Sequence, residues 1–376
     1  MKSDFKVLHV QFGIGDSGGI ANYISNLLKI PSPSNQKLYV TGSMKKRKEV
    51  INSKLFDPSK IIFIDLERYS LISLFFNVLN LSSIIKKNSI NLIHAHALRS
   101  GLLAFINRIL FSTKYVYTNH GLRFTQKKSL IKKIYFFIYE ILIIFFSDYS
   151  FCIRKVDFEK IRHLPFHFLI KHKLRLVKTK LKLPTLCSIK KFSDKKTIIG
   201  IGSLIDVKRP YIFLNIISEL YKINKNIDAI WLGDGNLREK LLEMNKKIQA
   251  PVRWIGHVNH NQVEKYLNTS SLILLTSEFE VFPLSIIEAY WGGVPVISYR
   301  FFGVEEFIQN GKTGLICNSS SNYGLIAKKI NSVISNDEKL LDMSKYVTNY
   351  FWENLYDKGC TYDLYFKIYH SISRIS

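Results

Sequence analysis

Short runs of valine, isoleucine and leucine alternate along this chain with longer segments whose apolar positions recur at helical spacing. This alternation is typical of parallel sheets covered by helices, because their strands are buried on both faces. In the first half the pattern predicts strands at Val7–Phe12, Leu38–Thr41, Ile61–Asp65, Leu92–His94, Tyr115–Thr118 and Tyr149–Ile153. In the second half it predicts strands at Thr197–Ile201, Ala229–Leu232, Arg253–Ile255, Leu272–Leu275, Pro295–Ser298 and Gly314–Cys317. The predicted fold class is therefore α/β.

The two sets of strands are separated by Leu181–Lys190, the best candidate for an interdomain linker. A chain of 376 residues fits two domains of ordinary size, which we place at residues 1–182 and 190–355. Doubly wound sheets bind ligands at the carboxyl ends of their strands. The motifs described below fall at such strand ends.

The most informative stretch runs from Ser277 to Ser298 and places two carboxylates, Glu280 and Glu288, around a predicted helix start. Pro283 suits the first turn of a helix, because its φ is already helical, and Gly292 with Gly293 supplies the stop. The free amides of a helix start attract phosphate or sugar oxygens. One carboxylate can then reach a sugar hydroxyl and the other a ribose diol, which outlines a nucleotide-sugar site.

These residues resemble the E-x7-E signature of retaining nucleotide-sugar glycosyltransferases with the GT-B fold, known as family four or glycosyl transferases group 1. The resemblance covers nearly the whole chain and rests on further motifs in the expected order: Ser17–Ile20, His94–His96, Thr118–Gly121, Lys208 after a strand that ends at Gly202, and Gly314–Ile316. It implies two Rossmann-like domains facing across a cleft, with acceptor bound by the first and nucleotide-sugar by the second. It also implies that residues 356–376 cross back to the first domain.

The resemblance assigns roles to residues of the second domain. Lys208 matches a lysine that contacts the diphosphate, Glu280 a residue that contacts donor-sugar hydroxyls, and Glu288 one that bonds the ribose. Leu284 and Ser285 would offer backbone amides to the phosphate, and Gly233 would lie near the nucleotide or form only a turn. Ser203 stands where the family usually has arginine, and Arg209 is a candidate substitute for that cation.

In the first domain, Gly18 and Gly19 form either a donor-site loop or a plain turn. His120 matches a family histidine near the donor sugar and acceptor, where a neutral imidazole can orient a hydroxyl or steer a proton. We expect His120, Glu280 and Lys208 to be the catalytic residues. His96 is an acceptor-side candidate and His94 a structural residue. No metal ligand set is expected around these histidines, and no cofactor is required.

The net charge is +25, and fourteen Lys and Arg face three acidic residues between Arg154 and Lys196. The preceding run Ile134–Phe146 is apolar apart from Glu140 and is shorter than the roughly 20 residues that cross a bilayer. It fits either a buried helix or, with Lys127, Lys128, Lys132 and Lys133, contact with an anionic membrane surface. No basic motif with interleaved stacking aromatics indicates nucleic acid. Four scattered cysteines and an N-terminus without a secretory signal predict a reduced, cytoplasmic protein at the inner face of the membrane.

The expected function is transfer of a sugar, with retention of configuration, from a nucleoside-diphosphate sugar to a glycan or polyprenyl-diphosphate-linked acceptor. A UDP-sugar is preferred on base rates and a GDP-sugar is the alternative. Composition resembling that of AT-rich bacteria places the enzyme in surface polysaccharide synthesis, O-antigen (lipopolysaccharide) or capsule. Two other readings stay open: a non-hydrolysing nucleotide-sugar epimerase, and a non-catalytic scaffold with a degenerate donor site, for which Ser203 is the support.

Overall fold

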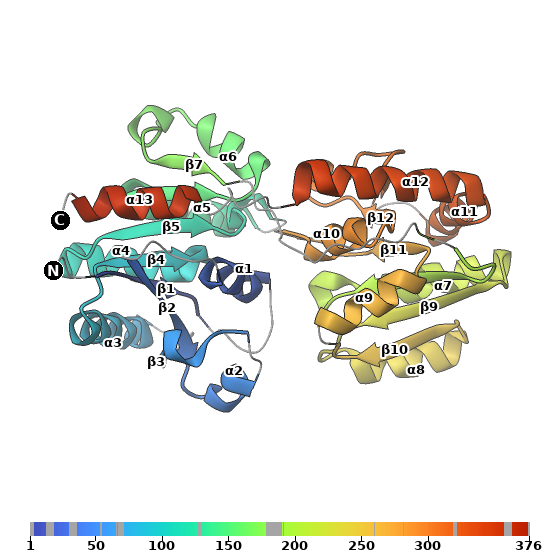
Figure 1. Cartoon of the computed structure of the whole chain (residues 1–376), viewed down its shortest axis with the longest axis horizontal. Coiled ribbons are helices and arrows are strands. Elements are labelled where there is room, and N and C mark those ends of the chain that lie inside the picture. The colour runs from blue at the N-terminus through green and yellow to red at the C-terminus, as the bar shows by residue number, and fades with distance from the viewer. Residues whose placement is uncertain are drawn as a thin grey trace. The chain divides into compact units, whose positions relative to one another are not determined.

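The computed structural model describes residues 4–12, 19–29, 36–52, 55–64, 66, 71–126, 129–177, 190, 192–258, 260–280, 282–318, 322–356 and 363–374. The chain divides into two compact units, Met1–Thr179 with Lys358–Ser376, and Lys180–Asp357. Each unit is a parallel sheet with helices on both faces (Figure 1).

Unit 1 contains a seven-stranded sheet in the order β3-β2-β1-β4-β5-β6-β7. Its strands are β1 (Phe5–Val10), β2 (Gln36–Ser43), β3 (Ile61–Ile64), β4 (Leu92–His96), β5 (Tyr115–Asn119), β6 (Tyr149–Cys152) and β7 (Leu174–Leu176). Its helices are α1 (Gly19–Leu28), α2 (Arg47–Asn52), α3 (Leu71–Asn88), α4 (Ala97–Phe111), α5 (Leu130–Phe146), α6 (Lys155–Arg162) and α13 (Asp363–Arg374). The strand order reverses direction between β1 and β4, which creates the switch point where doubly wound sheets hold ligands.

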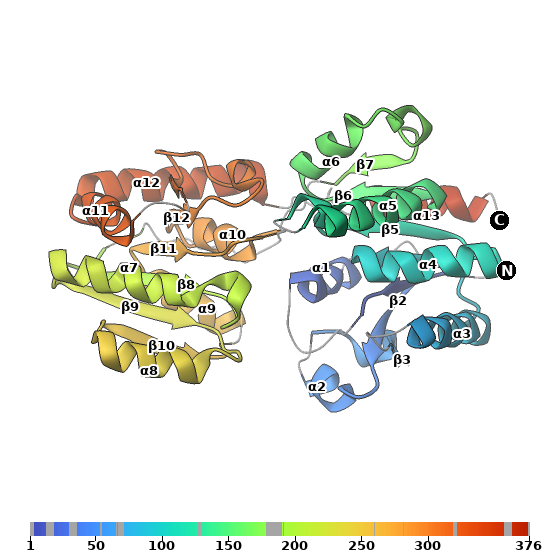
Figure 2. The ribbon, with the colours of Figure 1, turned by 180° about the vertical axis from the view of Figure 1, so that it is seen from behind.

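The two faces of this sheet differ in chemistry. Helices α3, α4 and α5 pack beside one another on one face, over Leu8, Ile93 and Ala95 (Figure 2). On the other face, α13 joins the sheet, since Tyr369 reaches His94 of β4 and Tyr365 reaches Tyr23 of α1. The last helix thus belongs to unit 1 although it follows unit 2 in the sequence.

Unit 2 contains a six-stranded sheet in the order β10-β9-β8-β11-β12-β13. Its strands are β8 (Lys196–Ile201), β9 (Ile227–Leu232), β10 (Val252–Gly256), β11 (Leu272–Leu275), β12 (Val296–Tyr299) and β13 (Gly314–Cys317). Its helices are α7 (Pro210–Ile223), α8 (Arg238–Ile248), α9 (His260–Thr269), α10 (Leu284–Trp291), α11 (Tyr323–Ile334) and α12 (Asp337–Tyr350). Two apolar clusters fill its faces, one under α7, α8 and α11 and the other under α9, α10 and α12.

All twelve predicted strands are present, with ends that differ from the prediction by no more than two residues. The continuous burial of Leu272–Leu275 explains why such strands read as apolar runs. The pattern missed β7, a three-residue edge strand in a basic segment, because pairing with β6 and not local sequence makes it a strand. Of the four cysteines, Cys152 and Cys317 are buried thiols, and Cys187 and Cys360 lie outside the described residues.

Candidate functional site

The loop that carries Lys208 is held at the carboxyl end of β8 by a close approach of two glycines. A Cβ on Gly233, whose φ is +132°, would lie 2.1 Å from the carbonyl oxygen of Gly202, so no side chain fits there. The amide of Gly233 donates to the carbonyl of Gly256 at 2.8 Å, and the indole of Trp231 donates to the carbonyl of Gly202 at 2.8 Å. These contacts require glycine at position 233 for structural reasons, whether or not Gly233 also contacts a nucleotide.

Lys208 and Glu280, 72 positions apart in the sequence, form an ion pair with 2.6 Å between Nζ and Oε1. Glu280 is buried, and the hydroxyl of Ser277 donates to the same carboxylate oxygen at 2.6 Å. Thr276 donates its hydroxyl to the carbonyls of Lys208 and Arg209, at 2.9 and 3.1 Å, which ties this loop to the end of β11. The strand ends of β8 and β11 therefore bring a cation and a carboxylate together in one half-buried site.

Arg209 and Ser203 lie in the same loop and help to determine how much positive charge the loop offers to a phosphate. The guanidinium of Arg209 pairs with Glu278 at 2.8 Å, so its charge is already offset by a carboxylate. Ser203 is exposed and supplies no charge where the family usually has arginine. In this structure both predicted cations are thus paired with a carboxylate, Lys208 with Glu280 and Arg209 with Glu278.

Helix α10 begins directly after these residues, with Pro283 at its N-cap position. The amide of Leu284 donates to the carbonyl of Phe282 at 2.9 Å, whereas that of Ser285 has no acceptor among the described residues. Glu288 is buried within the helix, 8% exposed. Within the described residues the helix start thus has an open amide, that of Ser285, one turn before a buried carboxylate, an arrangement suited to an anionic oxygen followed by hydroxyl groups.

Unit 1 holds a group of four buried histidines, His9, His94, His96 and His120, which we call the histidine cluster. They come from β1, β4 and the residue after β5, and their rings lie on the face of the sheet that α1 and α13 cover. Burial lowers the pKa of His9 and of His120 to about 3 and that of the other two well below 6.5. All four imidazoles are therefore neutral at physiological pH.

His96 was predicted on the acceptor side, but it is fully buried and both its ring nitrogens are hydrogen-bonded to other histidines. It presents no group to an acceptor in this structure. His94 has the structural setting that we predicted, since it is paired with Tyr369 at 2.5 Å and Thr118 at 2.6 Å.

Ligand atoms of His9, His94 and His96 lie within 4.8 Å of one another, which raises the question of a metal site. The rings of His94 and His96 are stacked, with centroids 4.2 Å apart and planes 25° apart. Lone pairs lie in the ring planes, so stacked rings do not converge on one ion. Both nitrogens of His94 are also engaged, and the geometry therefore does not fit a bound metal.

The structure describes only one of the two predicted donor-loop glycines near the start of α1. Gly18 lies outside the described residues. Gly19 begins α1 and is exposed, and a Cβ there would meet no atom within 4 Å. Space within unit 1 therefore does not require glycine at position 19.

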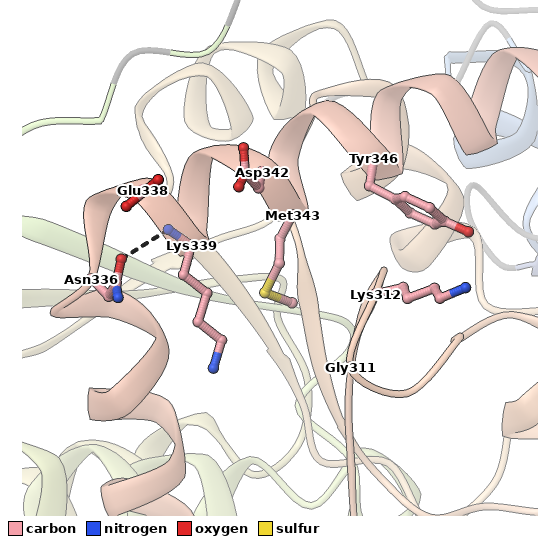
Figure 3. Close-up of a pocket in the computed structure, with 8 residues that line it drawn as sticks. All are labelled: Gly311, Lys312, Asn336, Glu338, Lys339, Asp342, Met343 and Tyr346. Atoms are coloured by element: carbon pink, nitrogen blue, oxygen red, sulfur yellow. Dashed lines mark hydrogen bonds between the residues drawn. The ribbon is translucent and has the colours of Figure 1, made fainter.

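The surface of unit 2 also has an open hollow of about 460 Å³ beside the N-terminus of α12 (Figure 3). Met343 lines it between Lys312, Lys339 and Tyr346, and Asn336 caps the helix by accepting from the amide of Lys339 at 2.9 Å. None of the predicted site residues lines this hollow. We therefore do not assign the donor site to it.

The outer surface of α3, α4 and α5 is unusually apolar. In α5, Leu130 and Ile131 are 72% and 81% exposed, and five further apolar side chains of the helix are also exposed: Ile134, Tyr135, Ile138, Leu142 and Phe145. The neighbouring helices add Ile72, Phe75, Phe76, Leu79, Ile109, Leu110 and Phe111. We call these residues the apolar face. Lys132, which is exposed, and Lys133, which is partly buried, belong to the first turn of α5. The one acidic residue of α5, Glu140, is buried against Tyr117.

Sequence reasoning missed several residues of these sites. Ser277 and Thr276 follow β11 directly, and their place at a strand end was the available signal. His9 pairs in register with His94 across β1 and β4, which becomes visible only when the strand order is known. Nothing in the local sequence points to Tyr365 and Tyr369 of α13.

Comparisons with known proteins indicate the family and the fold. Residues 187–350 match the family model of glycosyl transferases group 1, and residues 34–149 match that of glycosyl transferase 4-like proteins. The chain is 32% identical over 145 residues to 2-deoxystreptamine N-acetyl-D-glucosaminyltransferase of Niallia circulans, an alignment that covers 38% of this chain and only 37% of the relative. It is 26% identical over 257 residues to the O-antigen biosynthesis glycosyltransferase WbnH of Escherichia coli, over 68% of this chain and 72% of the relative.

Among solved structures, HepE of Anabaena in complex with UDP and glucose superposes with a TM-score of 0.75 at 13% identity, over 98% of this chain and 100% of HepE. At that identity the likeness shows the fold alone, and the fold is the two-domain α/β architecture of GT-B proteins.

Proposed function

Since the chain belongs to the glycosyl transferases group 1 family, we propose that it transfers a sugar from a nucleoside-diphosphate sugar to a glycan or lipid-linked acceptor, with retention of anomeric configuration. The ion pair of Lys208 and Glu280 is the observation that carries the proposal. It places, within hydrogen-bond distance of each other, one group that suits a diphosphate and one that suits sugar hydroxyls. These are adjacent parts of the proposed donor.

Breaking the bond between the anomeric carbon and the diphosphate leaves negative charge on phosphate. Lys208 offsets that charge, because its ammonium stands at the mouth of a half-buried site where electrostatic stabilisation is stronger than in water. Glu280, oriented by Ser277, accepts hydrogen bonds from donor-sugar hydroxyls. Both cations now contact carboxylates, so a bound diphosphate has to share or replace Glu280 at Lys208 and Glu278 at Arg209.

The nucleotide is assigned to α10. The open amide of Ser285 takes a phosphate oxygen, with the amide of Leu284 as a second donor if its bond to Phe282 is exchanged. Glu288, one turn further along, accepts from the ribose diol. A UDP-sugar is the preferred donor and a GDP-sugar the alternative; the UDP bound in HepE supports the first.

We propose that the acceptor hydroxyl attacks from the side of the leaving phosphate, which retains the configuration in one step. In that arrangement the phosphate oxygen takes the acceptor's proton, so the protein must position both substrates without supplying a base. Gly18 and Gly19 are proposed to let the chain approach the donor, and His120 to orient a hydroxyl near it.

For the acceptor we propose a glycan carried on polyprenyl diphosphate, in the synthesis of bacterial O-antigen or capsule. The similarity to WbnH supports this pathway, and the basic composition suits a diphosphate-linked lipid. The proposal requires no metal ion or other cofactor.

Thermal unfolding of the full chain with UDP, GDP, ADP and their sugar conjugates tests the donor site. We expect one nucleotide family to raise the Tm, and Glu288→Ala to abolish that shift. Glu243→Ala, an exposed glutamate of α8, is the matched control and should retain it. If no nucleotide changes the Tm, the transferase proposal fails. If a nucleotide binds but radiolabelled sugar reaches neither water nor a lipid acceptor extract, the chain is a scaffold.

We further propose that unit 1 lies on the cytoplasmic surface of an anionic membrane through the apolar face. Among the described residues no helix is both long and apolar enough to cross a bilayer. The apolar face combines exposed isoleucine and phenylalanine with Lys132 and Lys133, the combination that favours the boundary between headgroups and acyl chains. A second copy of the chain fits less well, because the net charge of +25 opposes self-association.

Vesicle flotation tests this surface. The full chain should float with vesicles that contain phosphatidylglycerol, and the double variant Ile131→Glu with Ile134→Glu should stay in solution. Leu242→Glu, an exposed position on unit 2, is the matched control and should float. Equal flotation of the double variant, or a dimer in solution that this variant abolishes, would contradict membrane binding.

A further inference from the structure

Three members of the histidine cluster form a continuous chain of hydrogen bonds. Nδ1 of His9 lies 2.9 Å from Nε2 of His96, and Nδ1 of His96 lies 3.0 Å from Nε2 of His120. His9 and His96 are fully buried and His120 is 8% exposed. The chain therefore leads from the interior of the sheet to the residue that the proposed function places beside the donor.

Only two arrangements of protons satisfy this chain. Each imidazole is neutral and carries one N–H, because desolvation holds the pKa of all three far below 7. In one arrangement every Nδ1 is protonated and donates toward His120. In the other every Nε2 is protonated and the bonds run toward His9.

The far nitrogen of His9 decides between them. Its Nε2 is buried and has no hydrogen-bond partner within the part of the chain that the structure describes. The second arrangement would place an N–H there without an acceptor, whereas the first leaves only an unused lone pair. Orphaned buried N–H groups are the rarer of the two in native proteins.

We propose that His9 and His96 are positioning residues that hold His120 with its proton on Nδ1, so that His120 can donate a hydrogen bond to a ligand oxygen but cannot accept a proton. Its other nitrogen, Nε2, is occupied by the N–H of His96. The role of His120 beside the donor rests on the proposed function, but its tautomer does not. The ligand atom that it meets is then an acceptor, such as a hydroxyl or phosphate oxygen.

The surroundings hold this chain in place. The ring of Tyr23 stands edge-on to His120, with centroids 5.2 Å apart and planes at 87°. Its hydroxyl bonds to that of Tyr365 at 2.5 Å, which ties the contact to α13. His94 packs 4.2 Å from His96 but has both nitrogens engaged elsewhere, and it therefore cannot reverse the chain.

Long-range ¹H–¹⁵N correlation on the full chain labelled at histidine reads the tautomer directly and needs no ligand. In the wild type we expect His120, assigned by loss of its signals in His120→Gln, to show a protonated Nδ1 and an unprotonated Nε2. In His96→Leu the fixed tautomer should be lost and His120 should populate the Nε2–H form. His96→Asn should restore it, because an asparagine amide can donate to Nε2 as the imidazole does.

His163→Leu, at an exposed site at the end of α6, is the matched control and should leave the tautomer of His120 unchanged. A wild-type His120 protonated on Nε2 would overturn the proposal, whether or not the variants fold. So would a His120 tautomer that is unaffected by His96→Leu. Failure of nucleotide binding would contradict the proposed function but would not change these spectra. A failure of the proposed function can therefore be distinguished from a failure of the tautomer proposal.

Discussion

Acid should unfold unit 1 selectively, because the histidine cluster is neutral in the folded state. The pKa of each of its members lies far below 6.5 when folded, whereas in the unfolded chain each titrates near 6.5. Between these values the unfolded state binds more protons than the folded state. The free energy of unfolding is therefore intact above about pH 6.5 and falls as the pH is lowered toward 3.

The magnitude follows from the unfolded pKa. At pH 5 protonation of a histidine with pKa 6.5 stabilises the unfolded chain by about 2 kcal/mol, or about 8 kcal/mol for four such residues. Domains have unfolding free energies of roughly 5–15 kcal/mol in total. Glu140 of the same unit, whose pKa is raised to about 8, acts in the opposite direction and restores about 2.5 kcal/mol between pH 7 and pH 5. The net loss of about 5 kcal/mol is still comparable with the stability of a small domain.

Urea unfolding between pH 7 and pH 5, followed by two probes, measures this effect. All four tryptophans, Trp231, Trp254, Trp291 and Trp352, lie in unit 2, so their fluorescence reports on that unit, whereas far-ultraviolet circular dichroism reports on both. The transition seen only by dichroism should move to lower urea as the pH falls. Replacing one cluster histidine, as in His94→Asn, should flatten that dependence by about 1.4 kcal/mol per pH unit, and His163→Asn should not. Equal slopes in wild type and His94→Asn would refute the reasoning.

Three further outcomes are expected. Burial raises the pKa of Glu140 to about 8, so between pH 4.5 and pH 8 the carboxyl is neutral in the folded state but ionised in the unfolded state, and stability falls as the pH rises. Glu140→Gln should therefore increase the free energy of unfolding at pH 7 by about 3 kcal/mol in urea titrations, and an unchanged value contradicts this. Gly233→Ala should lower the free energy of unfolding by about 3 kcal/mol or more and abolish nucleotide-induced stabilisation. Gly311→Ala, also at positive φ but with open space around it, should lower it by only about 1 kcal/mol. Similar losses of Tm in the two variants would argue against the close approach of Gly233 to Gly202. Ser277→Ala removes the hydroxyl that orients Glu280 and should lower kcat/KM for transfer roughly tenfold, about 1.4 kcal/mol. A wild-type value of kcat/KM would show that Ser277 does not contribute to the site.

The sequence by itself determined the α/β class and the twelve predicted strands. Buried parallel strands are apolar along their whole length, so an apolar run such as Leu272–Leu275 predicts a strand from the local sequence alone. Glycine and proline report local backbone geometry, and they therefore marked the ends of α10 correctly. These features depend on short-range steric and hydrophobic constraints that each segment carries alone.

Tertiary structure alone decided which side chains meet. The ion pair of Lys208 and Glu280 joins residues 72 positions apart, and its proximity follows from the adjacency of β8 and β11 in the sheet. His9 joins the histidine cluster through the register of β1 with β4, and Tyr365 joins it because α13 returns to unit 1. The same packing pairs Arg209 with Glu278 and buries His96. No local sequence pattern predicts either contact. Hydrogen bonds and charge pairs form only between groups a few ångströms apart in space. Separation along the sequence does not say which groups are that close until the order of strands in the sheet is known.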